Sequence, residues 1–219
     1  MTQNPNELTV ENSALVLIDH QPAVALAAPS LRTEVLINNV TGLAKMARAL
    51  KVPTVLTTVG AMGSVLADPI FKEIAEVFPD VTPIDRTSTH AWSHPEFRAA
   101  VERTGRKKLI MAGIATEVCL AQSVLAARKE GFDVYFVSDC STGLTQEAHD
   151  DAKVRMTMAG AKPINWLALL GEWTPDYTSP ERNAVVDIVS RHGGASAMWT
   201  DYALAQVKAG LVPVPAFAR

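Results

Sequence analysis

Short apolar runs rich in valine and isoleucine alternate along the chain with longer segments in which apolar residues recur every three or four positions. The short runs lie at residues 14–18, 53–58, 81–84, 108–113, 133–138 and 162–165. Uninterrupted runs of this length are typical of parallel strands that are buried on both faces. The pattern therefore predicts a three-layer α/β/α Rossmann-like fold with a six-stranded, mainly parallel sheet.

The segments between the runs carry helix signals. Between the first two runs, one helical face is traced by apolar residues at positions 36, 37, 40, 43, 44, 47 and 50. Pro53 prevents this helix from continuing. The residues "SHPE" predict a second helix with Ser93 as its N-cap, and this helix is expected to close at Gly105.

The next helix carries a cysteine near its start. Thr116 is a candidate N-cap, Gly131 lies just past the expected end, and Cys119 would occupy about the third helical position. A further helix is predicted from near Thr145 to Gly160. Cys119 would therefore stand at the amino end of a helix.

The pattern changes at about residue 172. Residues 173–219 predict two helices separated by Gly193 and Gly194, followed by an apolar tail punctuated by prolines. The chain is thus divided into an α/β domain over residues 1–172 and a C-terminal helical extension. This extension would either cover one end of the core or form a subunit interface. The second role is favoured by a set of apolar side chains that would otherwise be exposed: Trp199, Leu211, Val212, Val214 and Phe217.

Composition narrows the class of protein. The chain has 219 residues, 48% of them apolar, which is enough for one substantial core. Its net charge is only −3, with both signs mixed along the sequence, so nucleic acid and anionic membranes are not expected as partners. The polar N-terminus resembles no secretion signal, and no apolar run reaches 18 residues. We expect a cytoplasmic protein that acts on a small molecule.

The cysteines and histidines predict neither a disulfide framework nor a metal site. Cys119 and Cys140 form no CxxC pair and have no histidine at zinc-ligand spacing. The five histidines are scattered, and none pairs with another ligand at metal-binding spacing. We predict no metal and no cofactor.

The candidate chemistry depends on the strand order. If the order begins 3-2-1-4, the first strand lies beside the run at 108–113, and ligands bind beyond the carboxyl ends of these strands. Asp19 ends the first strand, and Cys119 follows the fourth. A helix amino terminus favours a thiolate, Asp19 could take the thiol proton, and nearby N–H groups could hold an oxyanion. The alternatives are a packed structural cysteine and a carboxylate that caps a turn.

The segments "ALVLIDHQ", "IDRTSTHAW" and "LIMAGIATEVCLAQSVLAARKEGFDVYFVSDC" together resemble the isochorismatase-like cysteine hydrolases. The resemblance covers about residues 10 to 172, and "GIATEVC" is its most specific part. Within that family it is greatest to the YcaC-type hydrolases, which are octameric and of unassigned specificity. The resemblance therefore implies a homo-oligomer, anywhere from a dimer to an octamer.

The family implies a triad of Asp, Lys and Cys, in which Asp19 is the base and Cys119 the nucleophile. The lysine position is occupied here by Arg86. Arginine stays protonated, so Arg86 can hold Asp19 and stabilise negative charge but cannot pass a proton. A surface salt bridge is the alternative role for Arg86.

The family also implies a cis peptide bond between Ile114 and Ala115. This bond would aim the N–H of Ala115, together with that of Cys119, into an oxyanion hole beside Thr116. Gln21, Trp92 and His90 could line the pocket. Packing or surface polarity would explain these three residues equally well.

Two comparisons within the superfamily narrow the range of reactions expected for this chain. Metal-dependent nicotinamidases place histidines near the second strand, and this region has none here. Enzymes that cleave the vinyl ether of isochorismate commonly lack the thiol, whereas this chain retains Cys119. The sequence therefore predicts a metal-independent hydrolase that cleaves a C–N bond of a small amide through a thioester. The alternative is a binding or redox-responsive protein in which Cys119 reacts with oxidants.

Overall fold

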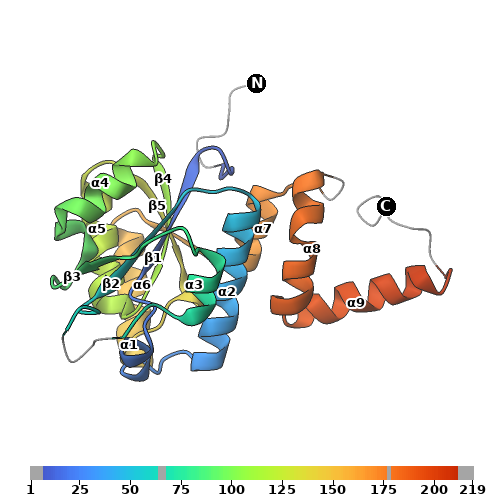
Figure 1. Ribbon diagram of the computed structural model, residues 1–219, viewed down its shortest axis with the longest axis horizontal. Helices are drawn as coiled ribbons and strands as arrows, with labels where there is room; N and C mark the ends of the chain where they lie inside the picture. The colour runs from blue at the N-terminus through green and yellow to red at the C-terminus, as the bar shows by residue number, and fades with distance from the viewer. Residues whose placement is uncertain (1–6, 64–67, 177–178, 212–219) are drawn as a thin grey trace.

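A computed structural model describes residues 7–63, 68–176 and 179–211 and shows a single twisted sheet between two layers of helices (Figure 1). All the strand pairs are parallel, and the order is β3-β2-β1-β4-β5-β6, which begins with the 3-2-1-4 arrangement assumed above. The strands are β1 (Ser13–Ile18), β2 (Thr54–Val59), β3 (Ile84–Arg86), β4 (Lys108–Gly113), β5 (Asp133–Val137) and β6 (Lys162–Ile164).

The third strand differs from its prediction. We expected it at residues 81–84, but β3 begins at Ile84 and ends at Arg86, where it pairs with Val59 of β2. Pro83 has no N–H to donate to the ladder, so regular pairing starts after it. This shift places Arg86 at the carboxyl end of a strand, beside β2.

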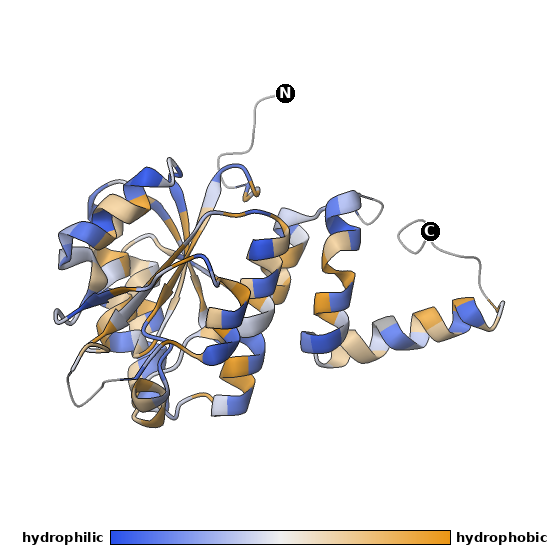
Figure 2. Cartoon of the chain, viewed as in Figure 1, coloured by the Kyte–Doolittle hydropathy of each residue, from blue (hydrophilic) through white to orange (hydrophobic). Residues whose placement is uncertain are grey.

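Alternating side chains of β1 enter two separate cores, as expected for a strand buried on both faces. Leu15 and Leu17 belong to the core beneath α1 (Pro22–Leu26), α2 (Thr33–Ala49), α3 (Lys72–Val77), α7 (Trp166–Trp173) and α8 (Pro180–His192). Val16 and Ile18 belong to the core beneath α4 (Pro95–Arg103), α5 (Ala121–Lys129) and α6 (Gln146–Met158). Figure 2 shows the hydrophobic strands between these more polar helices.

One predicted helix start is wrong and another is confirmed. Ser93 does not cap α4. It ends a short 3₁₀ turn (Ala91–Ser93), and its hydroxyl donates to the carbonyl of His90 over 2.9 Å. Pro95, whose backbone dihedral suits the first helical turn, begins α4 two residues later. Thr145 does cap α6, since its hydroxyl accepts from the N–H of Ala148 at 3.0 Å.

The C-terminal extension has two parts with different surroundings. The predicted boundary after residue 172 falls one residue before the end of α7, whose buried Trp173 donates to the Ser13 hydroxyl at 3.0 Å. Helix α8 packs on α2 and contributes Val185 to the core. After Gly193 and Gly194, α9 (Ala195–Lys208) packs against α8 and projects away from the sheet (Figure 1).

The apolar residues singled out in this extension are exposed where the structure describes them. Trp199 is 67% exposed and Leu211 is 70% exposed. Val212, Val214 and Phe217 lie outside the described residues. Among the helices that the structure describes, none combines the length and the apolar character needed to cross a membrane.

Candidate active site

The ends of β1 and β4 approach each other closely because Gly113 has no side chain. Ile18 and Gly113 are partners across this strand pair. A Cβ atom at position 113 would lie 2.9 Å from the Ile18 Cβ atom and 3.1 Å from the Ile18 carbonyl oxygen. Any larger residue would force the strands apart. Gly113 thereby sets the segment after β4 directly beside Asp19.

Asp19 leaves the strand in a left-handed conformation, with φ of 57°. Such a conformation costs a non-glycine residue on the order of 1–3 kcal/mol, although aspartate tolerates it better than most. Its N–H donates to the Thr57 carbonyl at 2.9 Å, and its carbonyl accepts from the Gln21 N–H at 2.7 Å. These bonds hold the Asp19 side chain in a fully buried position.

Arg86 makes a two-point ion pair with Asp19. Its two terminal nitrogens lie 2.6 Å and 2.7 Å from the two carboxylate oxygens of Asp19. It also donates to the Thr58 carbonyl at 2.9 Å. Both side chains of the pair are 0% exposed, so Arg86 does not form a surface salt bridge. The guanidinium occupies the same crevice as Asp19, beyond the carboxyl ends of β1, β2 and β3.

The backbone around Cys119 differs from the predicted helix start. The Ile114–Ala115 peptide bond is cis, as the resemblance implies. Residues Thr116–Leu120 form a π-helical turn, in which the Leu120 N–H donates to the Ala115 carbonyl at 3.2 Å, and α5 follows only from Ala121. The wider turn carries Cys119 ahead of the regular helix.

Thr116 does not act as the N-cap that the sequence predicts. Its hydroxyl lies 2.8 Å from the His149 Nδ1 atom, and its N–H donates to the Thr142 carbonyl at 2.9 Å. The backbone closes the π-helical turn without a side-chain cap, so the Thr116 side chain is used to bind α6 instead. Thr116 therefore anchors the loop that carries the cis peptide bond.

The Cys119 thiol lies close enough to the Asp19 carboxyl group and the Arg86 guanidinium for both groups to affect its pKa. Burial raises the pKa of Cys119 to about 12, and the negative charge of Asp19 adds to this rise. Arg86 and a backbone hydrogen bond from Ala115 oppose the rise but do not cancel it. The expected stabilisation of a thiolate by the helix terminus is therefore outweighed by desolvation, and the resting side chain is a thiol.

The pKa of Asp19 is also shifted by its surroundings. Burial raises the pKa of its carboxyl group, while the Arg86 bonds and the thiol hydrogen bond act in the opposite direction. Burial lowers the pKa of Arg86, but Asp19 more than reverses this effect, so the guanidinium stays charged. The site thus places a protonated thiol beside a buried carboxyl group that is paired with a charged guanidinium.

The side chain of Gln21 hydrogen bonds to backbone groups next to the site. Its amide nitrogen donates to the Asp68 carbonyl at 2.8 Å, and its amide oxygen accepts from the Val59 N–H at 2.8 Å. The side chain is fully buried. Gln21 thus ties the start of α1 to the end of β2 and to the residues before α3.

The structure places Trp92 in the core. Its ring lies edge-on to Phe97 and Phe132, with ring centroids 6.0 Å and 5.3 Å apart, and it is 3% exposed. Within the described residues, its indole nitrogen has no hydrogen-bond partner. These contacts favour the packing role for Trp92. His90 is only partly buried.

Ser123 is a site residue that the sequence reasoning missed. Its hydroxyl donates to the Cys119 carbonyl at 2.7 Å and accepts from the Ala91 N–H at 3.1 Å. It thereby links the turn that carries Cys119 to the segment that carries Trp92. The signal was available in the spacing, because a serine four residues after Cys119 lies one helical turn away.

The described residues offer no set of three His, Cys, Asp or Glu side chains that could hold a metal ion. Both oxygens of Asp19, the one carboxylate beside the thiol, are bonded to Arg86. The donor set of this crevice therefore does not fit a metal.

Known families and proteins match this arrangement. A model of the isochorismatase domain matches residues 13–167, and the chain therefore belongs to the isochorismatase family. It is 34% identical over 178 residues to "Probable hydrolase YcaC" of Escherichia coli, a match that covers 81% of this chain and 85% of that protein. These similarities define an isochorismatase-like hydrolase.

Two solved structures extend the match beyond the family domain. YcaC from Pseudomonas aeruginosa, determined with hexane-2,5-diol and covalent acrylamide, has a TM-score of 0.84 and 34% identity, covering 91% of this chain and 98% of that one. YcaC from Escherichia coli, an octameric hydrolase of unknown specificity, also has a TM-score of 0.84, at 32% identity, covering 93% of this chain and 100% of that one.

Proposed function

We propose that this protein is a cysteine hydrolase that cleaves the C–N bond of a small amide through a thioester and needs no metal. The observation that carries the proposal is the fully buried pair of Asp19 and Arg86, joined at two points, beside the thiol of Cys119. A nucleophile, a base and a group that orients the base are thereby brought together.

The proton must move as the sulfur attacks, because the resting thiol holds it up to high pH. Asp19 accepts this proton while the Cys119 sulfur bonds to the amide carbon and the carbonyl electron pair moves to oxygen. The N–H groups of Ala115 and Cys119 would hold the resulting oxyanion. As the C–N bond breaks, the departing amine takes the proton from Asp19 and a thioester remains.

Water then completes the cycle. Asp19 takes a proton from the water molecule as its oxygen attacks the thioester carbon, and the C–S bond breaks to release the carboxylic acid. The proton held by Asp19 returns to the sulfur and restores the thiol. Arg86 remains charged throughout, because its role is to orient Asp19 and compensate its charge.

The covalent acrylamide in the Pseudomonas aeruginosa relative supports a reactive nucleophile in this family, since acrylamide is an electrophile whose vinyl carbon bonds to nucleophiles such as thiols. The octamer of the Escherichia coli relative supports a homo-oligomer for this chain. A redox-responsive role is less well supported, because oxidants react with thiolates and burial keeps Cys119 protonated.

The test compares Asp19→Asn with the wild type in two assays. Release of ammonia from a panel of small carboxamides should fall about 10²–10⁴-fold, the usual contribution of a general base. Alkylation of Cys119 by iodoacetamide should nevertheless begin at lower pH in the variant, because a negative charge that raises the thiol pKa has been removed. A mere structural role for Asp19 does not predict these opposite changes.

Two variants serve as controls. Cys119→Ala should abolish turnover, whereas Cys140→Ala should retain it, because Cys140 is a fully buried core residue. Wild-type turnover in Asp19→Asn, or an alkylation profile that moves to higher pH, would contradict the proposed base.

A further inference from the structure

Helix α9 presents an exposed apolar stripe. Met198, Trp199 and Tyr202 are 75%, 67% and 65% exposed, and they are spaced so that they share one face of the helix. Ala195 and Ala205, at compatible spacing, are also exposed. The charged residues of α9 lie outside this stripe. Aromatic and methionine side chains are typical of the centres of protein interfaces.

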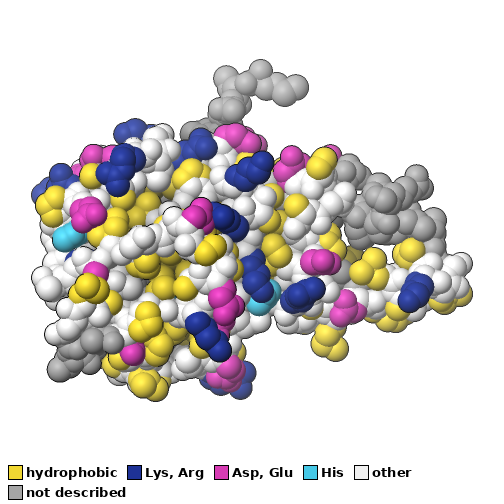
Figure 3. All heavy atoms as spheres, viewed as in Figure 1, with side chains coloured by type: hydrophobic (Ala, Val, Ile, Leu, Met, Phe, Trp, Pro, Cys, Tyr) yellow, Lys and Arg dark blue, Asp and Glu magenta, His cyan; other side chains and the backbone are white. Residues whose placement is uncertain are grey.

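An exposed apolar groove lies on the sheet domain, between α1, α2 and α3. It is lined mainly by carbon-rich side chains: Pro22, Leu26, Ile37, Ile70, Phe71 and Ala75. Leu26 is 82% exposed. Lys72 and Glu73 supply the charge along its lining. Figure 3 shows hydrophobic side chains over the region of α1 and α3 and again along α9.

The stripe and the groove do not meet within one molecule. Helix α9 leaves α8 after Gly193 and Gly194 and runs away from the sheet domain, whereas α1 lies at the far side of α2 (Figure 1). Helix α8 is held to α2 by hydrogen bonds between Asn38 and His192, at 2.8 Å and 3.1 Å, so its direction is set. Within the described residues, the apolar stripe of α9 and the apolar groove are thus not covered by each other.

We infer that the α9 stripe of one copy seats in the α1–α2–α3 groove of a second copy. The inference rests on the homo-oligomer proposed above and assigns the surfaces that form it. The described part of the chain carries both the stripe and the groove, so two copies can exchange their arms, and heterologous contacts can also close a ring. Both surfaces have little charge, so their contact would bury few charged groups without a partner.

The groove also adjoins the catalytic crevice. The N–H of Phe71 donates to the carbonyl of His20 at 2.7 Å, and the N–H of Ala23 donates to the Asp68 carboxylate at 2.7 Å. These bonds join the walls of the groove to the segment that follows Asp19. A partner helix in this groove would therefore rest on the backbone that positions the catalytic base.

Three exposed apolar residues allow a matched test by light scattering during size exclusion. Trp199→Asp on the stripe and Leu26→Asp in the groove should both elute at smaller mass than the wild type, down to 23.5 kDa for a single chain. Met158→Asp on α6 should keep the wild-type mass, although Met158 is 84% exposed. Circular dichroism should confirm that all three variants fold.

Disulfide trapping identifies the two surfaces directly. One preparation carries Leu26→Cys, and a second carries either Met198→Cys or Tyr202→Cys. The two preparations are unfolded, mixed, refolded together and then oxidised. Cross-links should join the unlike copies. Copies with Met158→Cys in place of Leu26→Cys should give none.

Three outcomes would overturn the inference: a monomeric wild type, equal masses for all three aspartate variants, or an oligomer without the Leu26 cross-links. A monomer that binds lipid vesicles through Trp199 would assign the stripe to a membrane surface instead. The Asp19→Asn assays in the proposed function do not depend on these masses or cross-links, so the two proposals can fail separately.

Discussion

The two ends of the sheet each carry an Arg–Asp pair with the same two-point geometry. At the carboxyl end, the Arg86–Asp19 distances are 2.6 Å and 2.7 Å, and both side chains are 0% exposed. At the amino end, the Arg48–Asp80 distances are 3.1 Å and 2.9 Å, and the side chains are 48% and 60% exposed. The same residue types therefore meet in opposite surroundings.

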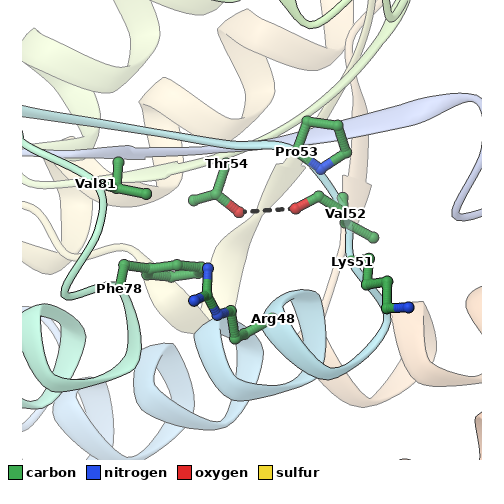
Figure 4. Close-up of a pocket in the computed structure, with 7 residues that line it drawn as sticks. All are labelled: Arg48, Lys51, Val52, Pro53, Thr54, Phe78 and Val81. Carbon is green, nitrogen blue, oxygen red and sulfur yellow. Dashed lines mark hydrogen bonds between the residues drawn. The ribbon is translucent and has the colours of Figure 1, made fainter.

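The surroundings decide what each pair can do. Arg48 lies beside an open hollow, 6.0 Å from the centre of the Phe78 ring (Figure 4). Besides Arg48, the hollow is lined by Lys51, Val52, Pro53, Thr54, Phe78 and Val81, so it offers cations and apolar surface but no thiol. Water screens the pair there. Around Arg86 and Asp19 water is excluded, and their charges act on the thiol of Cys119. Burial therefore makes the difference between a surface ion pair and a candidate active site.

The largest expected effect comes from removing the arginine of each pair in a separate variant. Arg86→Ala should lower the free energy of unfolding by about 3–5 kcal/mol, because Asp19 would be left buried without its partner charge. Arg48→Ala should leave the urea midpoint nearly unchanged, since Asp80 remains hydrated. Urea denaturation followed by circular dichroism measures both variants. Equal losses of stability would show that burial does not distinguish the pairs.

The second prediction uses the pH dependence of stability to test whether water is excluded at the carboxyl end of the sheet. Burial lowers the pKa of His20 from 6.5 to about 4, while a hydrogen bond to the Cys140 carbonyl opposes this change. As the pH falls below 6.5, His20 becomes protonated in the unfolded chain but stays neutral in the folded chain until about pH 4. Stability should therefore fall by about 3 kcal/mol between pH 6.5 and pH 4 on account of this residue.

The variant His20→Gln isolates this contribution, because its amide can still donate to the Cys140 carbonyl but does not titrate. Urea unfolding at pH 7.5 and at pH 4.5 should show a smaller loss of stability for the variant than for the wild type. The same loss in both proteins would mean that His20 is hydrated in the folded state.

The smallest expected effect compares one hydroxyl at each end. Ser123→Ala leaves the buried Ala91 N–H without its acceptor and should cost about 1–3 kcal/mol. Thr54→Val removes only a donor to the Val52 carbonyl, which accepts at 3.1 Å in a partly exposed position (Figure 4), and should be nearly neutral. Thermal unfolding measures both variants, and a larger loss for Thr54→Val would reverse the comparison.

The sequence predicted the parallel sheet and, given a strand order that begins 3-2-1-4, the meeting of Asp19 and Cys119, because apolar runs and helix signals report local periodicity. Its errors have different causes. Ser93 and Thr116 have the right residue types for N-caps, but the Ser93 hydroxyl bonds to the nearby His90 carbonyl and the Thr116 hydroxyl bonds to the distant His149. Pro83 displaces the start of β3, because it has no N–H to donate to the ladder.

The protonation state of Cys119 could not be predicted from the sequence. The position of Cys119 near a helix start indicates a thiolate, yet the thiol pKa depends on how completely water is excluded by residues distant in the chain, including Asp19 and Arg86. The exposed stripe of α9 is similar: the spacing of Trp199 and Tyr202 is visible in the sequence, but only the fold shows that α8 turns it away from its own core.

The sequence by itself determined the order of elements and the positions of Cys119 and Asp19 just beyond strand ends, because each depends on residue type and on neighbours within a few positions. The tertiary structure decided the charge of the thiol, the burial of the Arg86–Asp19 pair and the surfaces left uncovered. These properties depend on solvent exclusion by the whole fold, and solvent exclusion has no local signature in the chain.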